Sequence, residues 1–117
     1  QFVSIGSYTG NNNANGTFVP TLNSLGVSLQ PVWAITKPIG TGNWQMFDNK
    51  RSGYNVKNNE LLANIANDES GGSSLDIVTG GLKFRNTGGS NVSDRNSIYV
   101  VMGTPIIDTD GRIIAGR

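Results

Sequence analysis

The sequence contains neither cysteine nor histidine. Disulfides, thiolate nucleophiles and imidazole bases are therefore excluded, as is a zinc site built from the usual Cys and His ligands. No apolar run approaches the roughly 18–20 residues of a membrane-spanning helix, so we expect no membrane insertion. No signal peptide is visible either. Because the chain begins at Gln1, we expect a processed product, an excised domain or the ordered part of a longer chain.

Charge is also scarce. Charged residues make up 15% of the 117 residues and the net charge is +1, against about 25% charged residues in a typical globular domain. There is no dense stripe of Lys and Arg, so a nucleic-acid partner is not expected. Low charge leaves little repulsion between copies of the chain, which is compatible with close assembly. The length predicts one domain that covers residues 1–117.

The chain is instead rich in Asn, Gly, Ser and Thr, which favour turns and disfavour helices. Short apolar clusters return about every ten residues, which is typical of strands joined by tight turns. We expect an all-β fold, an antiparallel β-sandwich or jelly-roll-like domain with about eight to ten short strands. The better-defined expected strands cover residues 2–8, 17–22, 32–37, 44–48, 75–78, 82–85 and 97–102.

Three details of this pattern can be checked. Residues 32–48 should form a hairpin with Trp33 and Trp44 at its centre. Residues 60–66 fit either a single helical turn or a strand. The continuous apolar run in 97–102 predicts a strand that is covered on both faces.

The segment 44–51 combines large apolar side chains with Asp48 and Arg51. This pair could bind a polar ligand, but we favour a structural ion pair at a strand end. Trp33 and Trp44 could form a platform for a sugar ring, but tryptophans within strands are more often core residues. Tyr8, Tyr54 and Tyr99 are better surface candidates, since a phenol can keep its hydroxyl in water. Tyr8 and Tyr54 are therefore our candidate ligand-binding residues.

Acidic motifs give no catalytic or metal site. Asp108-Thr109-Asp110-Gly111 resembles the start of a calcium loop but lacks its third acidic position and its distal Glu. Asp68 and Glu69 are adjacent, and no second acid is fixed at the spacing that glycoside cleavage needs. We expect no catalytic residue, no cofactor and no metal, and hence no enzyme. Asn15-Gly16-Thr17 and Asn91-Val92-Ser93 fit the N-glycosylation pattern, but chance matches are expected in such a composition.

The segment 43–51 contains the spacing Trp-x-x-x-Asp-x-x-Arg, formed by Trp44, Asp48 and Arg51. It occurs together with Phe-Val-Ser-Ile-Gly-Ser-Tyr-Thr-Gly-Asn at 2–11, Pro-Val-Trp-Ala-Ile-Thr-Lys at 31–37, Gly-Leu-Lys-Phe at 81–84 and Asn-Ser-Ile-Tyr-Val at 96–100. In this order the segments resemble a domain near the C-termini of tail-fibre and other virion proteins of tailed bacteriophages, chiefly of the marine and cyanophage type. The residues before the Pro-led strand depart from that pattern, because Gly26 to Pro31 lacks its aromatic residue.

The resemblance implies a non-enzymatic virion protein located in the extracellular particle. Its first implied role is a tail-fibre domain that attaches the phage to a host surface glycan or protein. The alternatives are a capsid decoration or head-fibre protein, a self-assembling surface subunit, and, third, a carbohydrate-binding domain. Implied partners are other virion proteins and copies of the chain itself, as a homo-oligomer with a trimer favoured.

Overall fold

The computed structural model describes residues 2–51, 54–71 and 74–106 of the chain. These segments contain eight strands and one short 3-10 helix, η1. The strands are β1 (Val3–Thr9), β2 (Phe18–Pro20), β3 (Leu29–Pro38), β4 (Gln45–Asp48), β5 (Leu61–Leu62), β6 (Leu75–Val78), β7 (Gly81–Phe84) and β8 (Asn96–Pro105), and η1 covers Gly89–Asn91. The expected all-β fold is confirmed.

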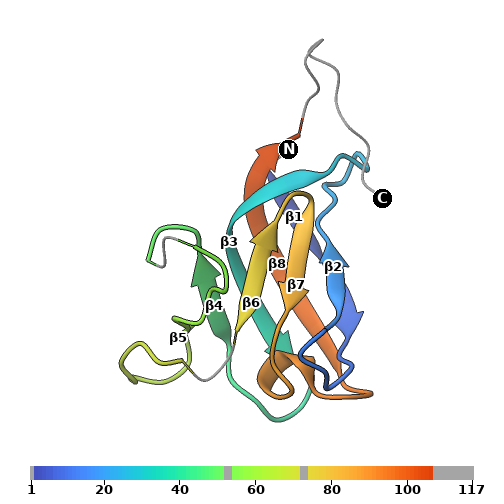
Figure 1. Cartoon of the computed structure of the whole chain (residues 1–117). Helices are drawn as coiled ribbons and strands as arrows, with labels where there is room; N and C mark the ends of the chain where they lie inside the picture. Colours follow the sequence, from blue (N-terminus) through green and yellow to red (C-terminus); the bar gives the residue numbers. More distant parts are fainter. Residues whose placement is uncertain (1, 52–53, 72–73, 107–117) are drawn as a thin grey trace.

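The strands form two antiparallel sheets that lie face to face (Figure 1). One sheet has five strands in the order β1-β8-β3-β4-β5, and the other has three in the order β2-β7-β6. In the view of Figure 1, β6 and β7 lie in front of β3 and β8. The architecture is a β-sandwich, in which each sheet buries one face against the other.

Hairpins join neighbouring strands where the turn signals predicted them. β3 pairs with β4 through Trp33 opposite Asp48 and Thr36 opposite Gln45, which confirms the hairpin within 32–48. β6 pairs with β7 across a turn in which Gly80 has a φ of 78°, a conformation that glycine adopts at little cost. Pro20 lies in the edge strand β2, where a missing backbone donor is tolerated.

The core lies between the two sheets. It consists of Tyr8, Val19, Ala34, Phe47, Leu75, Ile77, Leu82, Phe84, Tyr99 and Val101. Alternation explains this set, because every second residue of a strand points to the same face. The ring of Tyr8 stacks on that of Phe84 at a centroid distance of 5.0 Å.

The structure decides between the two alternatives for residues 60–66 and corrects the expected burial of β8. Residues 60–66 contain the two-residue edge strand β5 rather than a helical turn. In β8 the burial alternates along the strand, so β8 is covered on one face and not on both. Its apolar residues Ile98 and Met102 lie on the outer face, opposite the side of Tyr99 and Val101.

Candidate functional site

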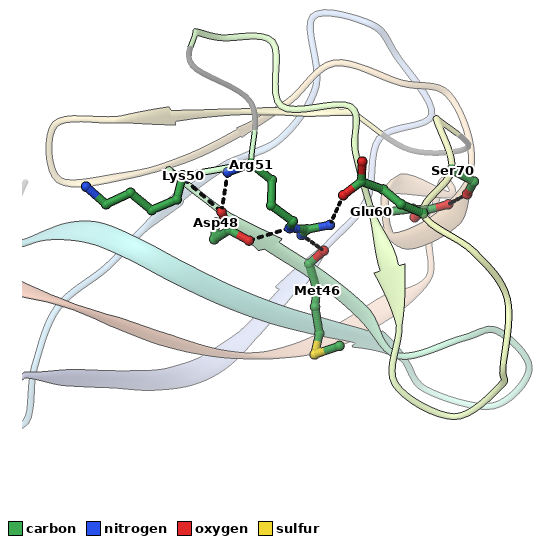
Figure 2. A network of polar contacts seen from close by, with 7 residues as sticks. Met46, Asp48, Lys50, Arg51, Glu60 and Ser70 are labelled. Carbon is green, nitrogen blue, oxygen red and sulfur yellow. Dashed lines mark hydrogen bonds and ion pairs between the residues drawn. The ribbon is translucent and has the colours of Figure 1, made fainter.

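Asp48 and Arg51 form the predicted ion pair at the end of β4. Arg51 Nε donates to Asp48 Oδ2 at 2.5 Å, and its Nη1 donates to Glu69 Oε2 at 2.8 Å. Arg51 Nη2 also donates to the carbonyl oxygen of Met46. Figure 2 shows the guanidinium between Asp48 and the main chain of Met46. Arg51 therefore links β4 to the loop that contains Glu69, and its donors already have partners within the protein.

Asp48 also organises the turn that follows β4. Its Oδ1 accepts hydrogen bonds from the backbone nitrogens of Lys50 at 2.8 Å and Arg51 at 2.9 Å (Figure 2). Desolvation alone would raise the pKa of Asp48. The hydrogen bonds from the Arg51 side chain and from the two backbone nitrogens, with the charge of Arg51, outweigh it and lower the pKa to about 2. The pair is thus a structural clamp, as the sequence indicated.

This clamp predicts a specific acid sensitivity. The folded-state pKa of Asp48 lies below the ordinary value of 3.8, so its contribution is complete above about pH 4 and is lost as the pH falls towards about 2. Because the carboxylate is partly solvated, we expect that contribution to be roughly 1–2 kcal/mol. Urea denaturation of the wild type and Asp48→Asn should show a stability difference at pH 6 that shrinks several-fold by pH 2. A difference that does not change with pH contradicts the assignment.

The two tryptophans are not in the core, contrary to the sequence-based expectation. Trp44 is 36% exposed and Trp33 is half-buried. Strand alternation is the reason, because Ala34 and Phe47 occupy the inner face next to them and are buried. Alternation along a strand shows that the strand has two different faces. It does not show which of them packs against the second sheet.

Tyr8 is not a surface residue either. It is 9% exposed, and its hydroxyl donates to the carbonyl oxygen of Ser90 at 2.9 Å. Burial raises its pKa to about 12, although hydrogen bonds with Ser97, Ser90 and Thr36 oppose the shift. Tyr8 is therefore a core residue with a bonded hydroxyl and is removed from the candidate ligand-binding set. Tyr99 is buried as well.

Sequence reasoning missed a buried polar chain next to the core. Ser90 in η1 contacts the hydroxyl of Thr36 at 2.8 Å and donates to Gln45 Oε1. Gln45 Nε2 in turn donates to Glu60 Oε2 at 2.6 Å. All four residues are buried. This series of hydrogen-bonded side chains joins η1, β3, β4 and the bridge residue Glu60. Its buried polar groups therefore find hydrogen-bond partners within the fold.

Tyr54 is the candidate whose exposure fits ligand binding. Its side chain is 89% exposed, and it lines a groove of about 370 Å³. The other residues of this polar groove are Gln30, Pro31, Asn49, Asn55, Lys57 and Ile77. They come from β3, from the segments after β4 and from β6, which are distant in sequence.

Hydrogen bonds to the backbone of β6 hold one wall of the polar groove in place. The side chain of Asn55 donates to the carbonyl oxygen of Ile77 at 2.8 Å and accepts from its nitrogen at 3.0 Å. Lys57 exchanges two backbone hydrogen bonds with Leu75, at 2.7 and 3.0 Å. The segment that follows Tyr54 is therefore held along β6. The exposed phenol of Tyr54 and the amide groups of Gln30 and Asn49 on such a support suit a polar, hydroxyl-rich ligand.

The remaining acidic candidates lie in two segments of the chain. Glu69 bonds to Arg51, while Asp108 and Asp110 lie outside the described residues. Across residues 2–51, 54–71 and 74–106, no group of three or more acidic side chains is close enough to hold a metal ion. Within the same ranges, no helix is long and apolar enough to cross a membrane.

The two glycosylation patterns differ in accessibility. Asn15 is exposed, but Asn91 is fully buried. Asn91 Nδ2 donates to Asn86 O at 2.7 Å, to Asn13 O at 3.0 Å and to Asn11 Oδ1 at 3.2 Å. Asn91 is thus a structural residue that holds the loop at 11–15, and its amide nitrogen is inaccessible for modification in the folded protein.

A family model described as "Domain of unknown function (DUF7483)" matches residues 1–104. The chain belongs to this family. The match to DUF7483 includes the Asp48–Arg51 clamp, the buried polar chain and the polar groove around Tyr54. No curated protein and no solved structure matches the chain.

Proposed function

We propose that this domain is a non-enzymatic module of a bacteriophage virion that attaches the particle to a host surface molecule. The observation that carries the proposal is the polar groove around Tyr54. It combines an almost fully exposed aromatic ring with the amide-bearing residues Gln30 and Asn49. Aromatic rings with one polar end and amide groups are suited to bind carbohydrate, because they contact both the apolar ring face and the hydroxyls of a sugar.

A shallow polar groove supports binding of modest strength at a single site. Such a site becomes effective when several copies act together, because linked sites raise the effective concentration for each further contact. A fibre that carries several copies of this domain meets that condition. The motif resemblance at Trp44, Asp48 and Arg51 supports the location in a tail fibre, with other virion proteins and copies of the chain as partners.

The second candidate function is a capsid decoration or head-fibre protein, or a self-assembling surface subunit. The low charge of the chain favours it, since copies repel one another little. Cryo-electron microscopy of the parent particle separates the two roles. A few copies at fibre tips support attachment, and many copies on capsid faces support decoration. The third candidate, a carbohydrate-binding domain outside a virion, shares the groove and differs in the parent particle.

The attachment proposal predicts that the domain binds host cells only when it is presented in several copies. We expect a streptavidin-linked tetramer of the biotinylated domain to label host cells and to reduce phage adsorption. The same concentration of unlinked domain should label the cells at least about tenfold less, given the usual gain from multivalency. A glycan array probed with the tetramer identifies the sugar class. A tetramer that neither labels the cells nor blocks adsorption contradicts the proposal.

A further inference from the structure

The outer face of the five-stranded sheet is unusually apolar. The pairing registers place Ile5 opposite Val100, Val100 opposite Ile35, Ile35 opposite Met46, and Met46 opposite Leu61. These five residues form one row across all five strands, on the side of the sheet that faces away from β6 and β7. Residues on the inner side, such as Ala34 and Val101, are fully buried.

Apolar residues continue on both sides of this central row. On one side lie Val3, Met102 and Trp33, which are cross-strand neighbours. On the other side Ile98 lies between Ser7 and Lys37. We call these three rows the outer apolar face.

Much of the outer apolar face is open to solvent. Ile5 is 72% exposed and Met102 48% exposed, and Val3 and Ile98 are exposed as well. Isolated exposed apolar residues are ordinary, but contiguous apolar patches of more than a few hundred Å² mark interaction surfaces. Because these residues form continuous rows, we expect the outer apolar face to bind a partner.

Charge on this face is low and already compensated. Lys37 Nζ donates to the carbonyl oxygens of Pro38 at 2.6 Å and Gly40 at 2.9 Å. Asp48, opposite Trp33 at the other end of the face, is bonded to Arg51. The face therefore offers no strong field that would select a highly charged partner. A surface that is itself apolar and nearly neutral, such as the same face of a second copy, meets it without repulsion.

The size of the face also fits pairing with itself. Its five strands contain 33 residues in all, at about 3.4 Å per residue along a strand and about 4.8 Å between neighbouring strands. A flat face of that extent provides roughly 550 Å² per copy, and the pleated side chains add to it, so two copies bury more than the approximately 1,000 Å² of a specific interface. The face is thus large enough for a modest dimer.

We propose that the outer apolar face is the contact between two copies of this chain, packed sheet against sheet. A two-fold axis that crosses the strands above the central row places that row over its own copy. The same axis brings Ile98 over Met102 of the partner subunit and Lys37 over the partner's Trp33. A lysine over a tryptophan ring is a favourable contact, so the face is complementary to itself under this operation. Such an isologous contact closes at two copies.

This inference rests on the part of the proposed function that invokes copies of the chain, but not on attachment to a host. Gln30, Asn49 and Tyr54 of the polar groove are not among the residues of the outer apolar face. Association and cell binding can therefore fail independently. Loss of self-association leaves attachment by a fibre possible, and loss of cell binding leaves the dimer contact intact.

Sedimentation velocity tests the proposal. Over roughly 1–100 µM, the wild type should shift from monomer to dimer, the range expected for a modest interface. Met102→Asp and Ile5→Asp each place a charge on the face at an exposed position. We expect each to weaken dimerisation at least about tenfold, because the new carboxylate would be buried against the apolar face of the second copy without a partner. Phe18→Asp is the matched control, because Phe18 is about as exposed as Met102 but lies on β2 in the other sheet. It should dimerise like the wild type.

The two tryptophans of the chain give a second measurement. Trp33 lies on the outer apolar face, and Trp44 directly precedes Gln45, so alternation places it on the same side. Iodide quenching of tryptophan fluorescence should therefore fall as the wild-type concentration rises, and not fall in Met102→Asp. Far-ultraviolet circular dichroism checks that the variants are folded. A wild type that stays monomeric, forms a trimer, or forms a dimer that both face variants leave unchanged overturns the proposal.

Discussion

Phe47→Ala is expected to lower the free energy of unfolding by about 3–5 kcal/mol, the usual cost of deleting a large aromatic side chain from a packed core. Phe47 is 1% exposed and belongs to the cluster between the two sheets. A cavity at this position cannot be filled easily, because Ala34 opposite Phe47 is small and fixed in the central strand β3. Since domains are stable by only about 5–15 kcal/mol, the loss is a large part of the total.

Trp44→Ala is the variant whose stability loss is to be compared with that of Phe47→Ala. Tryptophan is the larger side chain, and the sequence alone favours it as the core residue. Because Trp44 remains partly exposed, we expect its replacement to cost at most about 1.5 kcal/mol, a cost typical of positions outside the core. Urea denaturation of both variants, at a protein concentration below the range of self-association, gives the two values.

The order of the two values decides which face of β4 is buried. A larger loss for Phe47→Ala agrees with the register in which Gln45 and Phe47 point inward. A larger loss for Trp44→Ala would mean that the pairing of β4 with β3 is shifted by one residue. Such a shift exchanges the two faces of a strand and would turn Trp44 inward.

Asn91→Ala is expected to cost about 2–4 kcal/mol, because a buried amide with several partners is removed and their carbonyl groups lose a donor. Asn91 Nδ2 donates to three oxygens, and its Oδ1 accepts from the backbone nitrogen of Asn11 at 3.2 Å. These bonds connect η1 to the loop 11–15. Amide hydrogen exchange should therefore accelerate in that loop more than in β3 or β8.

Two further variants control for size and location. Asn91→Asp keeps the volume but places a carboxylate against the carbonyl oxygens of Asn13 and Asn86, so it should destabilise at least as much as alanine. Asn15→Ala changes an exposed asparagine of the same loop and should cost less than about 0.5 kcal/mol. If Asn91→Asp is as stable as the wild type, the donor role assigned to Asn91 is wrong.

The strands and their hairpins were predictable from local sequence. Turn signals at Gly80-Gly81 and between Pro38 and Asn43 separate apolar runs, and those runs became β6, β7, β3 and β4. The ion pair between Asp48 and Arg51 was also predictable, since its members are three positions apart at a strand end. Such features depend on residues that are close in sequence.

Which face of each strand is buried was not predictable in the same way. Trp44 and Phe47 both suit a core, and the choice depends on how β4 aligns with Ala34 in β3. The sequence predicts a surface position for Tyr8, because a phenol often reaches water. In the structure its ring stacks on Phe84 in the core, and its buried hydroxyl donates to Ser90, which is 82 positions away. The burial of Phe47 and Tyr8 thus depends on contacts between residues that are distant in sequence.

Of the polar groove, only Tyr54 was predictable. Gln30 and Ile77 contribute to the same groove because β3 and β6 lie in opposite sheets that pack together. No spacing along the chain relates them. The outer apolar face was missed for a similar reason, since its rows are visible only after the order β1-β8-β3-β4-β5 is known.

The central claim is that the polar groove attaches the particle to a host surface. The most direct test compares tetramers of the wild type, Tyr54→Ala and the control Leu25→Ala for binding to host cells by flow cytometry. Both replaced side chains are highly exposed, so both variants should fold. We predict that Tyr54→Ala reduces labelling at least about fivefold, since each lost contact is multiplied across the linked copies, and that Leu25→Ala does not. Equal labelling by wild type and Tyr54→Ala would contradict the claim.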